Sequence, residues 1–216
     1  PEEKELKLAV KVVGDYTQAV HKLDAGAAAL VEGPYGNFSH QSVSNRKQIW
    51  IAGGIGITPF LSMARSLQGD YDIDLFYCVA HVDEAHFRAE LARLSSEKGN
   101  LRLILHPSDV VGYLTASAVE TQVRGLSDKD IFMCGPTAMV EGLASQFRSR
   151  GVTADRIHIE RFGFGPPDRV PRSSSATSRS ASGTTRSPRS MLTNLLIAAF
   201  FFAVAVSALL IIKLAL

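Results

Sequence analysis

Apolar residues between positions 47 and 162 fall into two alternating patterns, short runs and longer stretches with helical spacing. The short runs are rich in β-branched and aromatic side chains and predict strands, whereas apolar residues at every third or fourth position predict helices. Strands that alternate with helices indicate a parallel sheet covered by helices. We therefore predict a doubly wound α/β domain over residues 45–165. The expected strands are residues 48–52, 73–80, 101–105, 130–134 and 156–160, and the expected helices are residues 59–68, 84–97, 115–123 and 137–150.

Residues 1–44 have a different pattern, with strand-like runs at residues 6–13 and 27–32. A short helical or looped piece at residues 15–23 and a turn separate the two runs. So short a stretch cannot bury a core of its own or close an antiparallel barrel. Because the chain also opens at Pro1 without an initiator methionine, we interpret residues 1–44 as the last portion of a preceding domain.

The C-terminal part of the chain changes composition twice. Residues 166–190 are rich in Pro, Ser, Thr and Arg and lack aromatic residues, so we expect a disordered linker. Residues 190–212 carry no charge, and a helix of that length spans roughly 34 Å, which is enough to cross a membrane. We predict a transmembrane helix over residues 191–216, with a buried core helix as the alternative. Arginines precede it and only Lys213 follows it, which predicts a single-pass membrane protein with its α/β domain on the cytoplasmic side.

Charge is distributed unevenly along the chain. Residues 1–165 hold 17 of the 23 Lys and Arg and 20 of the 21 Asp and Glu, a net charge of 17 − 20 = −3. Without clustered cations this part is poorly suited to nucleic acid, so we expect no nucleic-acid partner. The Ser/Arg tract leaves an RNA-binding segment as an alternative, although its arginines are sparse.

The two cysteines, Cys78 and Cys134, imply neither a disulfide framework nor a zinc site, and they fit a reducing, cytosolic environment. His81 and His86 are five residues apart and do not share a helix face, so we expect no metal.

A glycine-rich turn at residues 53–56 follows the first expected strand and leads into a helix. Glycines let a phosphate approach the backbone, and the free N–H groups at a helix start favour an anion. Thr58 adds a hydroxyl donor. The turn is not a GxGxxG fingerprint, because Pro59 replaces the third glycine, and it is not a P-loop, because no lysine follows. Taken alone, a plain turn between strand and helix remains the alternative.

A second turn of this kind, residues 134–136, follows the expected strand 130–134. Two such turns at the carboxyl ends of parallel strands create a crevice, the place where open α/β sheets bind ligands. Two further motifs flank the domain, EGPYGNF at residues 32–38 and ERF at residues 160–162.

Four motifs in this order, GPYGNF, AGGIGITPF, MCGPTAM and ERFGF, resemble those of the ferredoxin-NADP reductase superfamily. The stretch KVVGDYTQAVHKL is most similar to the ferric-reductase and NADPH-oxidase-like branch of that superfamily. The resemblance covers about residues 6–164. It implies a nicotinamide-nucleotide-binding domain preceded by the end of an antiparallel flavin-binding β-barrel, with FAD and either NADH or NADPH as cofactors.

The resemblance also implies roles for individual residues. The first turn would hold the dinucleotide pyrophosphate through Gly53, Gly54, Gly56, Thr58 and Pro59. The second turn would lie beside the nicotinamide, which Gly135, Pro136 and Met139 would contact. The catalytic residues next to the nicotinamide and flavin rings would be Cys134, Glu160 and Phe162. The flavin pyrophosphate would contact Gly14, Tyr16 and Thr17. The turn between the two cofactors would be Gly33, Pro34, Tyr35 and Gly36.

The chemistry of hydride transfer limits the role that Cys134 could have. The two cofactors carry the reaction, so a cysteine there is better interpreted as a small polarizable wall than as a nucleophile. An ordinary buried core thiol is the alternative.

Two features depart from the family pattern. The arginine-aromatic-serine motif that grips the flavin is absent from the chain, so we expect this fragment to bind flavin weakly. After strand 73–80, where NADP-selective relatives place a serine or arginine for the 2′-phosphate, this chain has His81 and Asp83. An acidic side chain would bind a ribose diol and repel a phosphate, which favours NADH. His81 and Arg88 could still accept a phosphate.

The sequence therefore predicts an enzyme in which NAD(P)H reduces a bound flavin. Single electrons then pass to a haem, an iron–sulfur protein or a ferric complex. The alternative is a non-catalytic, membrane-tethered module that binds nicotinamide nucleotides. A purely structural adaptor would leave both glycine turns without a role.

Overall fold

The computed structural model describes residues 5–12, 14–31, 33, 36–161 and 214–215. Its main feature is a five-stranded sheet in which all neighbouring strands are parallel, in the order β4-β3-β2-β5-β6. The strands are β2 (Lys47–Gly53), β3 (Asp72–Val79), β4 (Leu101–Pro107), β5 (Asp130–Gly135) and β6 (Ile157–Arg161). The first of them is central, and the chain proceeds from it to one edge and then to the other. This is the doubly wound order that the sequence predicts.

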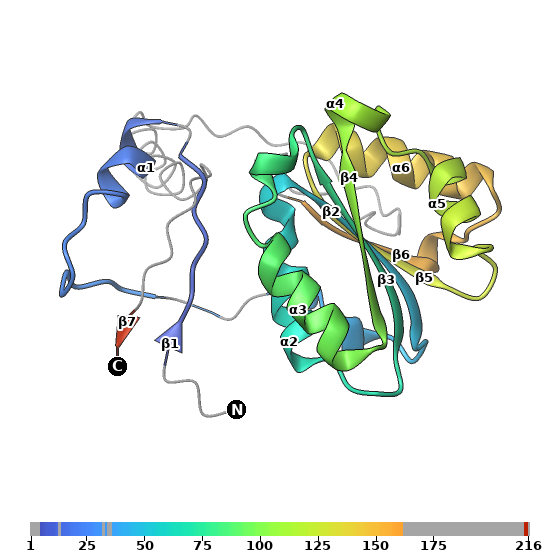
Figure 1. Cartoon of the computed structure of the whole chain (residues 1–216), viewed down its shortest axis with the longest axis horizontal. Coiled ribbons are helices and arrows are strands. Elements are labelled where there is room, and N and C mark those ends of the chain that lie inside the picture. Colours follow the sequence, from blue (N-terminus) through green and yellow to red (C-terminus); the bar gives the residue numbers. More distant parts are fainter. Residues whose placement is uncertain (1–4, 13, 32, 34–35, 162–213, 216) are drawn as a thin grey trace, which may run out of the picture.

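Helices cover both faces of the sheet (Figure 1). Helices α2 (Ile57–Ser66) and α3 (Arg88–Lys98) pack on one face, and α5 (Ala116–Val123) and α6 (Thr137–Ser149) pack on the other. Each of the four predicted helices is confirmed, although α3 begins later than expected because a 3-10 turn, Val82–Glu84, precedes it. The short helix α4 (Ser108–Val111), which follows β4, was not predicted from the sequence.

A buried polar side chain fixes the segment before β2 against the sheet. The indole of Trp50 donates a hydrogen bond to Gln48 Oε1 at 2.9 Å. The Gln48 amide in turn donates to the carbonyl oxygens of His40 at 2.9 Å and Asn45 at 2.7 Å. Because Gln48 is fully buried, these bonds offset its desolvation and hold the preceding segment in place.

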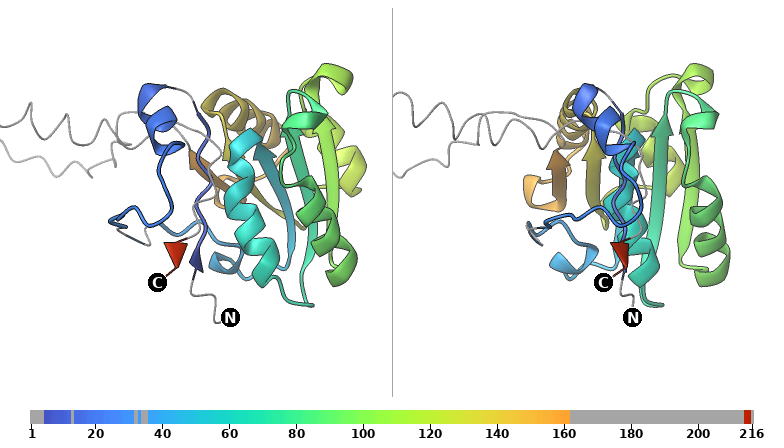
Figure 2. Two further views of the ribbon diagram at one scale, coloured as in Figure 1. Left: turned by 60° about the vertical axis from the view of Figure 1, so that its left-hand side comes forward. Right: turned by 90° about the vertical axis from the view of Figure 1, so that its left-hand side faces the viewer.

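The N-terminal residues lie outside the layered domain. Helix α1 (Asp15–Val20) confirms the helical piece predicted there, and β1 (Glu5–Leu6) pairs antiparallel with β7 (Leu214–Ala215). Figure 1 shows β1 and α1 to one side of the layered domain, well apart from α2, although the turned views of Figure 2 bring the two segments into overlap. Beyond β1, the described residues of the two predicted N-terminal strands form no strand, so that prediction is wrong. Those residues have no neighbouring strand to pair with, and Leu30 is fully exposed.

Among the helices that the structure describes, none is long and apolar enough to cross a membrane. The predicted linker, residues 166–190, and residues 191–213 and 216 of the predicted membrane helix lie outside the described residues. Leu214 and Ala215, the two described residues of that stretch, form β7. The linker and the membrane helix stay predictions.

Candidate functional site

The two glycine turns meet at the carboxyl edge of the sheet. Strands β2 and β5 are direct neighbours, with Ala52 paired to Cys134, so the turns that follow them lie side by side. From β2 the chain continues toward β3 and β4, whereas β5 leads to β6 on the other side. This is the point at which the strand order switches, where open α/β sheets bind their ligands.

Most glycines of the two turns serve the contact between the turns. A Cβ atom added to Gly53 would lie 2.6 Å from Met139 Cε, and one added to Gly135 would lie 2.9 Å from the Cα atom of Gly53. Gly56 packs in the same way against the backbone of Cys134. These three glycines and Met139, predicted to contact the cofactor, therefore also have a packing role that the motif did not reveal.

Gly54 differs from its neighbours because it faces open space. Its φ is +53°, and a Cβ atom added to it would meet no heavy atom within 4 Å. The 3-10 turn Gly54–Gly56 leads directly into α2 (Ile57–Ser66), and the Ile57 N–H already donates to the carbonyl oxygens of Gly54 and Ile55. No side chain caps the start of the 3-10 turn at Gly54. Uncapped N–H groups at the start of a helix attract an anion. Gly54 is thus the point of the first turn at which a phosphate can reach the backbone.

A pocket of about 550 Å³ opens beside Gly54, and we call it the edge pocket. It runs along the carboxyl ends of three strands and over one side of α6, and its size suits a small organic ligand. Its lining residues are Lys11, Gly53, Gly54, Cys78, Val79, Ala80, Glu84, His106, Ser108, Tyr113, Leu114, Pro136, Ala138, Met139, Gly142, Leu143 and Gln146. Of the predicted cofactor residues, Gly53, Gly54, Pro136 and Met139 come together here.

A smaller pocket of about 250 Å³, the side pocket, adjoins the edge pocket. Its lining residues are Lys11, Gly54, Ile55, Ile57, Tyr77, Glu84, His86 and Phe87. Lys11, Gly54 and Glu84 line both pockets and therefore surround the boundary between them.

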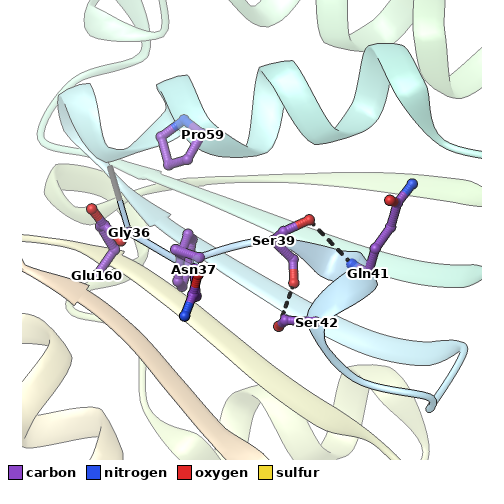
Figure 3. Close-up of a pocket in the computed structure, with 8 residues that line it drawn as sticks. Gly36, Asn37, Ser39, Gln41, Ser42, Pro59 and Glu160 are labelled. Carbon is purple, nitrogen blue, oxygen red and sulfur yellow. Dashed lines mark hydrogen bonds between the residues drawn. The ribbon is translucent and has the colours of Figure 1, made fainter. Parts of the chain in front are cut away.

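A third pocket, the Glu160 pocket, has a volume of about 570 Å³ and lies beside the segment that precedes β2. Figure 3 shows Glu160 and Gly36 near one end of it and Gln41 and Ser42 near the other. Its other lining residues are Asn37, Phe38, Ser39 and Pro59. Three predicted residues, Gly36, Pro59 and Glu160, come together here although they belong to three separate motifs.

Aromatic contacts hold one wall of the Glu160 pocket. The ring of Phe38 packs edge to face on Phe60 and on Phe132, with ring centroids 5.6 Å apart in each case. Such pairs add to the stabilisation from burial alone. Phe38 therefore fixes the chain between Gly36 and Ser42 against the sheet.

The cysteines occupy different places. Cys134 is fully buried and is not among the residues that line the three pockets, whereas Cys78 lines the edge pocket. Burial, with a smaller effect of Glu160, raises the pKa of Cys134 to about 12, and burial raises the pKa of Cys78 to about 12. Both thiols are therefore protonated at neutral pH, which does not suit a nucleophile.

A charged pair directly follows two residues of the edge pocket: His81 comes after Ala80, and Asp109 comes after Ser108. Asp109 itself does not line the pocket, and we call the two residues the rim pair. His81 Nδ1 and Asp109 Oδ2 are 2.8 Å apart, and the hydrogen bond to Asp109 raises the pKa of His81. The backbone N–H of Asp109 donates to the carbonyl oxygen of Ala80, which joins the ends of β3 and β4. His81 and Asp83 do not line the described pockets, but the neighbouring Glu84 does. In the part of the chain that the structure describes, no three acidic, histidine or cysteine side chains form a candidate metal site.

The predicted flavin-contacting residues are largely engaged within α1. The backbone N–H of Gly14 donates to Thr17 Oγ1 at 3.2 Å, and the Thr17 hydroxyl donates to the Gly14 carbonyl at 2.9 Å. This reciprocal pair closes the first turn of the helix. Tyr16, by contrast, is largely exposed.

Several further predicted residues do not enter the described pockets. Thr58 is half-buried in the first turn of α2, and Gly33 has a φ of +148°. Pro34, Tyr35 and Phe162 lie outside the described residues.

Several residues that line the edge pocket were missed from the sequence. Cys78, His106, Ser108 and Tyr113 lie in or after β3 and β4, and Gln146 lies on α6. A signal for most of them existed, because the carboxyl ends of all parallel strands meet at one edge of the sheet. Residues just after the expected strands 73–80 and 101–105 were therefore candidates.

Comparison with known proteins gives consistent matches over this region. The oxidoreductase NAD-binding domain family matches residues 50–145. The carnitine monooxygenase reductase subunit of Escherichia coli (strain K12) is 35% identical over 127 residues, which cover 55% of this chain and 36% of that protein. The ferredoxin–NAD(+) reductase component of the Xanthobacter autotrophicus alkene monooxygenase system is 30% identical over 172 residues, covering 73% and 52%. The chain thus spans from about a third to a half of the length of these relatives.

Solved structures share the fold. The flavohemoglobin of Malassezia yamatoensis matches with a TM-score of 0.59 at 21% identity, over 69% of this chain and 41% of that chain. The cytochrome b5 reductase domain of Ulva prolifera nitrate reductase matches with a TM-score of 0.57 at 20% identity, over 68% and 64%. At these identities the likeness concerns the arrangement of helices and strands.

Proposed function

Because the chain belongs to the ferredoxin-NADP reductase superfamily, we propose that it receives a reduced nicotinamide dinucleotide and positions its ring for hydride transfer to a flavin. The superfamily consists of NAD(P)H-dependent flavoprotein oxidoreductases with FAD and NAD(P)H as cofactors, so the predicted superfamily, enzyme class and cofactors are confirmed. The ferric-reductase and NADPH-oxidase-like branch stays a prediction. The residue roles, the electron acceptor and the membrane location of the protein, which are given below, are proposals.

One observation carries the proposal: Gly54 faces open space at the uncapped start of the 3-10 turn that leads into α2, next to a pocket of about 550 Å³. A pyrophosphate at this point would accept hydrogen bonds from backbone amides without a Cβ atom in the way. The remaining lengths of the edge pocket on either side of Gly54 would take the two nucleoside ends. A non-catalytic binding module would use the same pocket, so the tests below include electron transfer.

The two ends of the dinucleotide would lie in opposite directions from Gly54. Tyr113 lines the edge pocket with an exposed ring, 90% accessible, beyond the end of β4. Such a ring suits stacking on an adenine base. Pro136 and the second turn are on the other side of the first turn, so the nicotinamide would lie there, close to the strand pair that carries Cys134 and Glu160.

The flavin ring would occupy the region of the Glu160 pocket. The described residues fit one side of a flavin: Glu160 and Gly36 form one end of a pocket of about 570 Å³, although the Thr17 hydroxyl is already engaged in α1. When bound, a flavin accepts a hydride and releases electrons one at a time. The protein's own contribution would be alignment. Buried Cys134 and fixed Phe38 exclude water on this side of the sheet.

The charges at the rim favour NADH over NADPH. Glu84 lines the edge pocket, and Asp109, paired with His81, directly follows the lining residue Ser108. Carboxylates can accept hydrogen bonds from a ribose diol and would repel a 2′-phosphate. The proposal for NADH therefore rests on Glu84 and Asp109 rather than on Asp83.

An iron–sulfur centre is the acceptor that the relatives suggest. Two of them are reductase components of oxygenase systems, and one is described as a ferredoxin–NAD(+) reductase component. Haem and ferric complexes are the other outcomes to test. We further propose, from the uncharged stretch at residues 190–212 alone, that the chain is a single-pass membrane protein with this domain on the cytoplasmic side.

Two measurements on the full chain test the proposal. Calorimetric titration with NAD+ and NADP+ should give a measurable affinity for NAD+ and a weaker one for NADP+. Because flavin binding is expected to be weak, FAD is added in excess under anaerobic conditions; NADH should then bleach the flavin absorption faster than it does without protein, and a ferredoxin or a c-type cytochrome should be reduced. Binding heat without faster bleaching would favour the non-catalytic module, and absence of heat with both dinucleotides would remove the proposed site.

A further inference from the structure

Among the three methionines that the structure describes, Met139 is the one whose side chain reaches a pocket. Met63 and Met133 are buried in the cores on the two faces of the sheet and line none of the three pockets. Met139 lies in the first turn of α6, is half-buried and lines the edge pocket. A thioether that faces a pocket can meet a small oxidant from solvent, whereas a buried one is shielded.

The thioether of Met139 fills the space that two glycines leave between the two turns. A Cβ atom added to Gly53 would lie 2.6 Å from Met139 Cε and 2.9 Å from Met139 Sδ. One added to Gly135 would lie 2.8 Å from Met139 Cε. The end of this side chain therefore packs against the backbone of both turns at once. Because methionine is unbranched and flexible, it suits such an irregular gap.

We propose that Met139 is an oxidation site, and that its conversion to methionine sulfoxide loosens the contact between the two glycine turns and obstructs the edge pocket. The oxidant is hydrogen peroxide. The Met139 sulfur forms a bond to one peroxide oxygen, the O–O bond breaks, and two electrons pass from sulfur to peroxide. The proton on the transferred oxygen goes to the departing hydroxide, so the products are the sulfoxide and water.

The added oxygen has two places to go, and both disturb the site. An oxygen on the side of Gly53 would push the turns apart, and overpacking of this kind is destabilising. If the sulfoxide leaves the gap instead, the packing there is lost, and a bulkier polar group enters the edge pocket. Oxidation should therefore lower both the stability of the protein and its affinity for NAD+. The second effect rests on the proposed function, whereas the first does not.

The two thiols are poor competitors for the oxidant. Peroxide reacts with thiolates, but burial raises the pKa of Cys78 and of Cys134 to about 12, so both are protonated at neutral pH. The fourth methionine, Met191, lies outside the described residues. Its oxidation is therefore followed separately in the experiment.

Peptide mass spectrometry of the full chain, after graded doses of hydrogen peroxide, tests the site itself. Met139 should be oxidised several-fold faster than Met63 and Met133, because it alone of the three lines a pocket. Met191 and Cys78 are followed in the same digest. Oxidation of Met139 at the rate of the two buried methionines would overturn the proposal.

Thermal unfolding and calorimetry with NAD+, on the same samples, test the consequence. Oxidation should lower the Tm by roughly 2–4 °C or more and weaken NAD+ binding about tenfold. Met139→Leu has a similar volume and cannot be oxidised, so peroxide should change neither quantity relative to the untreated variant. Met63→Leu is the matched control, and peroxide should lower its Tm and its NAD+ affinity as in the wild type.

The outcomes separate the oxidation site from the proposed function. Sulfoxide at Met139 without a change in Tm would overturn the proposal, and so would equal losses in peroxide-treated Met139→Leu. A lower Tm with unchanged NAD+ affinity would overturn the obstruction of the pocket while the proposed function stands. Wild-type protein that binds no NAD+ would remove the proposed function, and the mass spectra and the Tm would still decide on the oxidation site.

Reversal gives a further test that does not depend on a variant folding. Methionine sulfoxide reductases for the two sulfoxide epimers should restore the Tm and the NAD+ affinity of the oxidised wild type. If both stay low after the sulfoxide has disappeared from Met139, the losses have another cause and the proposal is overturned.

Discussion

The carbonyl oxygen of Cys134 lies so close to Gly56 that a Cβ atom added to Gly56 would stand 2.2 Å from it. Real Cβ atoms do not approach a backbone oxygen to that distance, so a side chain at Gly56 would force β2 and β5 to separate at their carboxyl ends. The two turns that carry the site are therefore one packed unit. Substitutions at the contact between the two turns should reduce stability, whereas substitutions on the side that faces open space should reduce ligand affinity.

On the inside of that unit, Gly56→Ala should mainly reduce stability. Overpacking of a tight site costs typically about 1–3 kcal/mol, and here the obstacle is backbone, which cannot turn away. We expect the free energy of unfolding, from urea denaturation followed by Trp50 fluorescence, to fall by at least that amount. Gly69→Ala is the control, because a Cβ atom there would meet nothing within 4 Å. Equal stability of the two variants would contradict the packing argument.

On the open side, Gly54→Val should remove NAD+ affinity by placing a side chain in phosphate space. The positive φ also strains any β-branched residue, so some stability should be lost as well. Gly99→Val is matched for that strain, since Gly99 has a φ of +69° and open space around it but does not line the pockets. Calorimetry should find NAD+ binding lost in Gly54→Val and kept in Gly99→Val. Loss in both would assign the effect to strain.

The different environments of Gly53, Gly54 and Gly56 show how far the sequence alone predicts the site. A glycine motif after a strand predicts a turn, and the periodicity of residues 47–162 predicts the sheet and its helices, because both depend on neighbours along the chain. Whether Gly53, Gly54 or Gly56 faces a ligand depends on β5 and Met139, which are far away in the sequence. The same reason explains why Tyr113, Ser108 and Lys11 were missed.

Other predictions also depend on contacts between segments that are far apart in the sequence. Gly36, Pro59 and Glu160 line one pocket because β2 and β6 lie on either side of β5 and the segment before β2 carries Gly36 beside them. The N-terminal strands expected at residues 6–13 and 27–32 do not form beyond β1, because a strand needs a partner and apolar runs alone do not supply one.

We expect Gly142 to lower the stability of α6 and to leave space in the edge pocket. It lies in the middle of α6 and lines the edge pocket, and a Cβ atom added to it would meet no heavy atom within 4 Å. Glycine inside a helix costs about 0.5–1 kcal/mol relative to alanine, so Gly142→Ala should raise the free energy of unfolding by about that amount. Gly142→Leu should also stabilise the helix but weaken NAD+ binding, because leucine extends into the pocket.

Ser145→Leu is the control for Gly142→Leu, because Ser145 is exposed on α6 and does not line the edge pocket. Thermal unfolding and calorimetry should show NAD+ affinity reduced in Gly142→Leu alone. If both leucine variants bind NAD+ like the wild type, α6 does not form a wall of the nucleotide site.

His40 should make the fold sensitive to acid. It is nearly fully buried, and neither ring nitrogen has a hydrogen-bond partner among the described residues. Burial, and to a lesser degree the charge of Arg46, lowers the pKa of His40. The unfolded chain therefore binds a proton at higher pH than the folded one, and stability should fall as the pH drops through the ordinary histidine value of about 6.5. Above that value His40 should contribute no pH dependence.

His40→Phe keeps an aromatic ring against Tyr71 and Trp50 and removes the titrating group. The difference in unfolding free energy between wild type and His40→Phe, measured by urea denaturation from pH 5 to 8, should grow in favour of the variant below pH about 6.5. His21→Phe is the control, because His21 is exposed on α1's C-terminal side. A difference that is constant over this range would contradict a buried neutral His40.

Discrimination between NAD+ and NADP+ should depend on Asp109 and on pH. The hydrogen bond to Asp109 raises the pKa of His81, so His81 carries a positive charge that partly balances Asp109 below that raised value. As the pH rises through it, His81 loses its charge while Asp109 keeps its own. The rim then repels a 2′-phosphate more strongly, so the preference for NAD+ should increase with pH.

Asp109→Asn removes the negative charge and the stronger partner of His81. We expect NADP+ affinity to rise several-fold, with NAD+ affinity little changed, and the pKa of His81 to move down toward its ordinary value. Calorimetry with both dinucleotides between pH 6 and 9, together with an NMR titration of His81, would measure the two effects. Asp155→Asn is the control, because Asp155 precedes β6 at the opposite edge of the sheet. If Asp109→Asn leaves the ratio of the two affinities unchanged at every pH, cofactor choice does not depend on this rim pair and Glu84 becomes the residue to vary.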